Sequence, residues 1–127
     1  MTRETSRPNP RRLCFVNYFG TVGGGQAHLL GLLQDMDRTR FEPEVVCCQD
    51  GPFPDRLRDL GFVVHRIPFG KGKRRYLHVS LPAMWKFHRL LRARRWDLVQ
   101  VSGLQEAKLA AYPAAWAGVP MLWVVAP

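Results

Sequence analysis

Short apolar runs alternate with longer stretches of helical periodicity, and this alternation most constrains how the chain can fold. The apolar runs have strand length and occupy residues 12–18, 44–48, 62–67, 97–101 and 121–125. Between the first two runs, leucines at helical spacing form one stripe from Leu29 to Met36. Strands that alternate with helices predict a parallel sheet with right-handed crossovers. We therefore expect an α/β fold, a Rossmann-like open parallel sheet of about five strands with helices on both faces.

Proline and glycine predict the bounds of the second helix. Pro54 suits the first turn of a helix, and Gly61 is placed to end it. Leu57 and Leu60 are then expected to face inward.

Polar capping residues predict where the later helices begin. Ser80 is the expected N-cap of a third helix over 81–94, after a basic loop that starts near residue 69. Ser102 with Gln105 matches a capping box at the start of a fourth helix. Pro113 should kink or shorten that helix.

Composition and length place the chain among small folded proteins. The first eleven residues are polar and are expected to form a flexible leader, whereas 12–127 form a single domain. The longest apolar run, 119–127, is far shorter than the ~20 residues of a membrane span. The three cysteines show no C-x-x-C spacing, so we expect buried reduced thiols and a cytoplasmic protein.

A glycine-rich segment, F-G-T-V-G-G-G-Q-A-H at 19–28, follows the first strand directly and suggests an anion site. The P-loop frame fits from Gly20 to Gly25 but then fails. Gln26 and Ala27 stand where the phosphate-binding lysine and the magnesium-binding hydroxyl are required. The segment therefore disfavours a nucleoside triphosphatase.

A dinucleotide-binding frame fits the same segment in part. Gly23 and Gly25 match its first two glycines, but His28 stands in place of the third. Asp50, just after the second strand, keeps open the alternative of a small dinucleotide-binding module.

The segment fits best a glycine turn followed by a helix whose free amides point at a phosphate. Gly23, Gly24, Gly25 and Gln26 would form this turn. The alternative is that the glycines only allow the chain to turn.

A longer pattern extends over most of the chain. It runs G-G-G-Q-A-H-L-L-G-L-L-Q-D-M-D-R-T-R-F-E-P-E-V-V-C-C-Q-D-G-P-F-P-D-R-L-R-D-L-G-F-V-V-H-R-I-P, and continues in R-R-W-D-L-V-Q-V-S-G-L and A-A-W-A-G-V-P-M-L-W-V-V. This pattern resembles the amino-terminal, acceptor-side domain of glycosyltransferase family 4 enzymes of the GT-B fold. The resemblance implies a retaining enzyme that moves a sugar from a nucleotide-sugar donor to an acceptor. It implies that the glycine loop, with Gln26, faces the donor diphosphate. It also implies that Ser102 and Gly103 border the acceptor.

The chain departs from this family in ways that bear on activity. Gln26 replaces a frequent glutamate, Gln100-Val101-Ser102-Gly103 replaces a histidine-bearing turn, and Ala126 stands where a histidine often lies beside the reacting sugar. The carboxyl-terminal donor-binding domain is absent from these residues. We therefore expect an excised domain, a relic, or one subunit of a split enzyme that needs a separate donor-binding polypeptide or self-association. A noncatalytic interaction or membrane-docking subunit is the alternative.

The excess of positive charge is concentrated in two segments. Nineteen Lys and Arg oppose ten Asp and Glu, for a net charge of +9. The cations gather in Lys71, Lys73, Arg74 and Arg75, and on one face of the third helix beside Trp85, in Lys86, Arg89 and Arg92.

These cations are expected to contact an anionic membrane or a lipid phosphate at the inner face of the membrane. The alternative is a solvated charged surface. Aromatic residues are not interleaved with the basic run, so nucleic acid is disfavoured. His88 is expected in the core. We expect no cofactor and no metal.

Overall fold

The computed structural model describes residues 10–68 and 76–124, except for the side chains of 76–80 and 104. Its elements alternate as the sequence predicts. They are β1 (Arg11–Asn17), α1 (Gly24–Asp35), β2 (Phe41–Cys47), α2 (Pro52–Asp59), β3 (Val63–Arg66), α3 (Tyr76–Ala93), β4 (Leu98–Val101), α4 (Leu104–Ala117) and β5 (Met121–Trp123).

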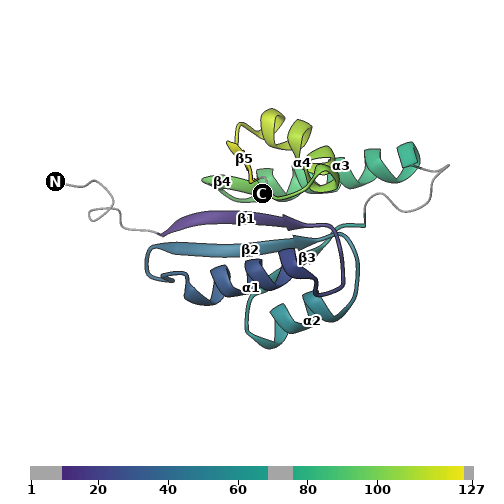
Figure 1. Cartoon of the computed structure of the whole chain (residues 1–127). Helices are drawn as coiled ribbons and strands as arrows, with labels where there is room; N and C mark the ends of the chain where they lie inside the picture. Colours follow the sequence, from purple (N-terminus) through teal and green to yellow (C-terminus); the bar gives the residue numbers. More distant parts are fainter. Residues whose placement is uncertain (1–9, 69–75, 125–127) are drawn as a thin grey trace.

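The five strands form one parallel sheet in the order β3-β2-β1-β4-β5. Helices α1 and α2 lie on one face of the sheet, and α3 and α4 lie on the other (Figure 1). The predicted Rossmann-like fold is confirmed. Strand β1 is central: Cys14 lies opposite Glu44 of β2 and opposite Val99 of β4.

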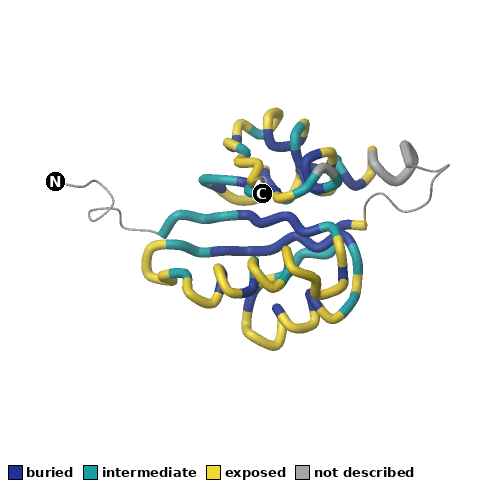
Figure 2. Tube along the Cα trace, in the orientation of Figure 1, coloured by how far each residue is buried: buried dark blue, intermediate teal, exposed yellow. Residues whose placement is uncertain are grey.

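Alternate side chains of the strands build two separate apolar cores, one on each face. Cys14 and Val16 join the core under α3 and α4, whereas Phe15 joins the core under α1 and α2. The central strands are therefore buried on both faces (Figure 2). This explains why they read as continuous apolar runs.

The adjacent cysteines at the end of β2 point to opposite faces, so each lies in a different core. Cys14, Cys47 and Cys48 are all free and buried, as predicted. Burial disfavours the thiolate and raises the pKa of Cys47 to about 12 and that of Cys48 to about 12.

Helices α2 and α3 differ from the prediction at their ends. Leu60 does not face inward, because it is the C-cap of α2 and is 39% exposed. Helix α3 begins at Tyr76, so Ser80 lies inside the helix and is not its N-cap. The rest of the predicted basic loop, residues 69–75, lies outside the described residues. Helix α3 accommodates Pro82 at its seventh residue.

Helix α4 begins one position away from the predicted capping box. Its N-cap is Gly103, which makes no side-chain capping bond, so the pairing of Ser102 with Gln105 is wrong. The buried Oε1 atom of Gln105 has no hydrogen-bond partner among the described residues. Pro113 does not shorten the helix, which continues to Ala117.

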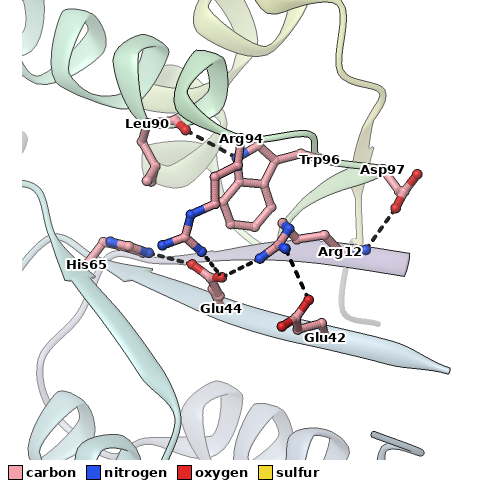
Figure 3. A network of polar contacts seen from close by, with 8 residues as sticks. All are labelled: Arg12, Glu42, Glu44, His65, Leu90, Arg94, Trp96 and Asp97. Atoms are coloured by element: carbon pink, nitrogen blue, oxygen red, sulfur yellow. Dashed lines mark hydrogen bonds and ion pairs between the residues drawn. The ribbon is translucent and has the colours of Figure 1, made fainter. Parts of the chain in front are cut away.

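The buried carboxylate of Glu44, in the middle of β2, contacts side chains from β1, from β3 and from the segment that follows α3 (Figure 3). The Glu44 side chain is 3% exposed and accepts a hydrogen bond from Arg12 at 3.0 Å. Its other contacts are with His65 Nε2 at 2.7 Å and with Arg94. Arg12 also pairs with Glu42 at 3.2 Å. This network connects β1, β2 and β3 through side chains and contains none of the predicted site residues.

Candidate functional site

A pocket lies at the carboxyl ends of β1 and β4, where the strand order of the sheet reverses. Crossovers leave β1 and β4 in opposite directions, and such a switch point is where open α/β sheets bind ligands. The pocket has a volume of about 360 Å³. Its wall is largely apolar, and Gly24, Gly25 and Ser102 line its polar side. The structure thus brings the predicted glycine loop and the predicted acceptor-side turn together.

The first turn of α1 presents unpaired backbone donors to this pocket. The amides of Gly24 and Gly25 stand at the start of the helix and have no intrahelical acceptor. Helix α1 has no acidic residue in its first turn, whereas α2 has Asp55 and α4 has Glu106. The positive end of the α1 dipole is therefore not neutralised by a carboxylate of its own.

Neither backbone conformation nor packing explains the glycines of this turn. Gly24 and Gly25 are not among the positive-φ glycines. A Cβ atom at either position would meet no described atom within 4 Å. Gly20, by contrast, packs against the Asp50 carbonyl, so a side chain there would clash. The structure thus gives no support to the idea that Gly24 and Gly25 only allow a turn.

Gln26 faces the loop itself and is not part of the pocket lining. Its Oε1 atom accepts a hydrogen bond from the Gly23 amide at 3.0 Å, and its Nε2 atom donates to Asn17 Oδ1 at 2.9 Å. Sequence reasoning missed Asn17, which is 4% exposed. A polar residue that ends an apolar strand is the signal that could have found it.

On the α4 side of the pocket, a buried carboxylate lies beside the glycine at the α4 N-cap. Glu106 is 5% exposed, and its Oε2 atom accepts a hydrogen bond from the Tyr18 amide at 3.0 Å. A side chain on Gly103 would clash with the carboxylate of Glu106. Gly103 thus leaves space for the carboxylate of Glu106, and it does not line the pocket. The sequence signal for Glu106 is an acidic residue in the first turn of a helix.

Asp50 and His28 bear on the dinucleotide alternative. Asp50 forms a bidentate ion pair with Arg66, in which the guanidinium nitrogens lie 2.9 and 3.2 Å from the two carboxylate oxygens. The carboxylate of Asp50 therefore already has a partner. His28, at the position of the third glycine, lines the pocket. No carboxylate belongs to the described part of this lining.

The predicted basic surface is described only in part. Lys71, Lys73, Arg74 and Arg75 lie outside the described residues, as does Ala126. On α3, Trp85 is 54% exposed, and Lys86, Arg89 and Arg92 are also exposed.

The structure adds two aromatic residues of α4 to this surface. The ring of His88 lies 5.7 Å from that of Trp85 and 4.7 Å from that of Trp116. Tyr112 lies one turn before Trp116 on the same face of α4. His88 is buried, as predicted, and neither ring nitrogen has a partner among the described residues.

Two features are absent from the part of the chain that the structure describes. Over 10–68 and 76–124, no three His, Cys, Asp or Glu side chains gather in a way that could hold a metal ion. In the same ranges, no helix combines the length and apolar character needed to cross a bilayer.

Comparison with known proteins gives one family match and several similar folds. The family model described as a glycosyl transferase 4-like domain matches residues 23–127. No curated protein matches the sequence. MurG from Acinetobacter baumannii is similar in structure, with 18% identity and a TM-score of 0.74 over 91% of this chain and 35% of that one. Anabaena HepE in complex with UDP has 18% identity and a TM-score of 0.69 over 88% of this chain and 28% of that one.

The same fold also occurs in a different setting. The C-terminal domain of a hydrogenase from Pyrococcus furiosus has 16% identity and a TM-score of 0.64, over 92% of this chain and 95% of that domain. At such identities the likeness shows the fold alone. The chain spans about a third of the length of MurG and somewhat less of HepE.

Proposed function

The chain belongs to the glycosyl transferase 4-like domain family, and from this premise we propose that it is the acceptor-binding half of a retaining glycosyltransferase. The enzyme moves a sugar from a nucleotide-sugar donor to an acceptor. Gly24 and Gly25 face the donor diphosphate, and the turn at Ser102 borders the acceptor. A separate donor-binding part completes the cleft, in keeping with the share of the similar solved chains that this chain spans.

The observation that carries this proposal is the open first turn of α1. As the bond from the sugar to the diphosphate breaks, negative charge accumulates on the leaving phosphate oxygens. Backbone amides that are already oriented stabilise that charge without reorganising. Gly24 and Gly25 leave the space beside these amides empty. The presence of UDP in the HepE structure is consistent with a diphosphate ligand for this fold.

Titration of the ¹⁵N-labelled chain with UDP and with inorganic pyrophosphate tests the anion site. We expect the amide signals of Gly24 and Gly25 to shift on addition of either ligand. Gly24→Ala and Gly25→Ala should weaken binding, because the added methyl group occupies the phosphate position. Gly31→Ala is the matched control, since Gly31 lies in the same helix and a Cβ there also meets open space. Equal binding by all three variants would contradict the proposal.

A reconstitution assay tests the transfer reaction. The chain is combined with a polypeptide that supplies the donor-binding half, and sugar transfer from a nucleotide sugar is followed by NMR. A product with the anomeric configuration of the donor supports a retaining mechanism. An inverted product contradicts the retaining mechanism, and no transfer with a partner that binds both donor and chain favours a noncatalytic subunit.

A second role, docking to an anionic membrane surface, is favoured by an aromatic surface on α3 and α4. This surface comprises four exposed residues, Leu81 (65%), Trp85 (54%), Tyr112 (77%) and Trp116 (71%). Leu81 and Trp85 are one turn apart on α3, as Tyr112 and Trp116 are on α4, and His88 joins the two pairs.

The charge around the aromatic surface has one sign. Helix α3 contains Lys86, Arg89 and Arg92 and no acidic residue, and the only acid of α4, Glu106, is buried. Tryptophan and tyrosine favour the head-group region of a bilayer, where Lys and Arg meet anionic lipids. The Lys71 to Arg75 run precedes α3 in the sequence and adds to the same charge. We therefore propose peripheral docking at the inner face of the membrane.

Co-sedimentation with vesicles tests the docking role. Vesicles that contain phosphatidylglycerol should bind the chain, and vesicles of phosphatidylcholine alone should not. The double variant Trp85→Ser/Trp116→Ser should lose binding, whereas Arg56→Glu/Arg58→Glu on α2, which lies on the other face of the sheet, serves as the control. Loss of binding in the control but not in the tryptophan variant would show that charge alone attracts the vesicles.

A further inference from the structure

We propose that Glu106 is a positioning residue that orients the diphosphate-binding turn from the opposite side of the cleft. The role of the turn in binding a diphosphate rests on the proposed function. The connection from Glu106 to the turn consists of hydrogen bonds within this chain. Glu106 belongs to α4 and the glycine turn belongs to α1. The two are connected through the end of β1, which lies between them.

The first link of the connection is the hydrogen bond from the Tyr18 amide to Glu106 Oε2, at 3.0 Å. Tyr18 is the residue directly after β1, so this bond fixes the direction in which the chain leaves the sheet. Glu106 itself is 5% exposed, and burial leaves its carboxylate few ways to move.

The second link passes through Asn17, the neighbour of Tyr18 in the chain. The Asn17 side chain donates from Nδ2 to the Phe19 carbonyl and accepts at Oδ1 from Gln26 Nε2. Gln26 then accepts from the Gly23 amide at 3.0 Å. The orientation of Tyr18 is thereby transmitted to the first turn of α1, where the phosphate-facing amides lie.

The position of Glu106 in α4 also explains why a carboxylate is tolerated there. It is the third residue of α4, where the positive end of the helix dipole stabilises an anion. The first turn of α4 therefore carries an anion of its own, whereas the first turn of α1 contains no acidic residue. Glu106 thus holds the turn without placing its own carboxylate at the N-terminus of α1, where the donor diphosphate would bind.

Two substitutions separate the hydrogen bond of Glu106 from its charge. Glu106→Asp keeps the charge but draws the oxygen back by one methylene group, so the bond to Tyr18 is lost. Glu106→Gln keeps an oxygen that accepts from Tyr18 but removes the charge. Glu44→Gln is the control, because Glu44 is equally buried but contacts Arg12, His65 and Arg94, which lie outside the glycine turn.

The readouts are the ¹⁵N order parameters of Gly23, Gly24 and Gly25 in the ligand-free chain and the affinity of the chain for inorganic pyrophosphate. In Glu106→Asp we expect the order parameters to fall from the rigid range towards the flexible one. Pyrophosphate binding should weaken by about 3- to 30-fold, the range typical of coupled networks. Glu106→Gln and Glu44→Gln should match the wild type in the order parameters of the turn.

Unchanged glycine order parameters in a folded Glu106→Asp variant overturn the proposal. If that variant does not fold, a loss of order in Glu106→Gln overturns it, because the bond is then not what holds the turn. A wild-type chain that binds no pyrophosphate refutes the anion site of the proposed function. The order parameters still decide whether Glu106 positions the turn.

Discussion

The side-chain amide of Gln26 donates a hydrogen bond to Asn17 Oδ1 over 2.9 Å and so joins the first turn of α1 to the last residue of β1. The same side chain accepts from the Gly23 amide. In this chain the residue serves as a donor and an acceptor at once, which a carboxylate cannot do.

Replacement of Gln26 by glutamate should therefore lower stability. The carboxylate still accepts from Gly23 but cannot donate to Asn17, so one partly buried hydrogen bond is lost. We expect the free energy of unfolding in urea to fall by about 1 kcal/mol. Gln34→Glu, on the exposed part of the same helix, should change it by much less. Equal effects of the two substitutions would show that the bond to Asn17 contributes nothing.

The Glu44 network predicts unequal effects for two glutamates of one strand. Glu44 is buried among three basic partners, whereas the Glu42 side chain is 45% exposed and pairs only with Arg12 (Figure 3). Glu44→Gln should lower the free energy of unfolding by about 1–3 kcal/mol, since bonds to a buried charge are lost. Glu42→Gln should cost at most about 1 kcal/mol. Urea denaturation of both variants checks this, and a Glu42 variant as unstable as the Glu44 variant would refute it.

Gly51 should tolerate no side chain. Its φ of 149° is rare for other residues, and a Cβ atom there would clash with the Gly20 carbonyl. That carbonyl accepts from the Phe53 amide at 2.9 Å, so it cannot move without loss of a bond. We expect Gly51→Ala to lower the melting temperature clearly, by calorimetry. Gly31→Ala, with open space at its Cβ, should leave the melting temperature unchanged or raise it.

The buried cysteines predict a loss of stability at alkaline pH. The pKa of Cys47 and that of Cys48 are each raised to about 12 by burial, whereas thiols of the unfolded chain ionise near pH 8.5. The stabilisation is complete below pH 8.5 and decreases as the pH rises towards 12, because the unfolded state alone loses protons. The free energy of unfolding should therefore fall between about pH 9 and 12.

The variant Cys47→Ala/Cys48→Ala supplies the control for this pH dependence. Its free energy of unfolding should decrease less steeply over the same interval, whatever its value at neutral pH. Urea denaturation at a series of pH values measures both slopes. Identical slopes would assign the alkaline transition to other groups, such as tyrosine and lysine.

The alternation of strands and helices and the glycine turn could be predicted because each depends on local pattern. Buried parallel strands produce apolar runs, and crossovers make the chain alternate between strand and helix. Helix ends were less predictable. Ser80 is a residue type that often caps helices, but it lies inside α3. Gly103, and not Ser102, is the N-cap of α4. Capping propensity is worth about 1 kcal/mol, which tertiary packing readily outweighs.

The long-range contacts could not be found from the sequence, since each joins residues that are distant in the chain. Glu106 contacts Tyr18 across 88 positions, and Arg94 contacts Glu44 across 50. The rings of Trp85 and Trp116 both lie beside that of His88, because α3 and α4 pack on the same face of the sheet.

The sequence by itself determined the α/β alternation, the family and the location of a glycine turn after the first strand, because periodicity and turn chemistry act over a few neighbouring residues. Only the tertiary structure decided which glycines are open to a ligand. Gly20 is closed by the Asp50 backbone, while Gly24 and Gly25 face empty space beside the pocket. The chemistry of a residue limits what it can bind. The space around that residue depends on segments that are distant in the sequence and that folding brings close to it.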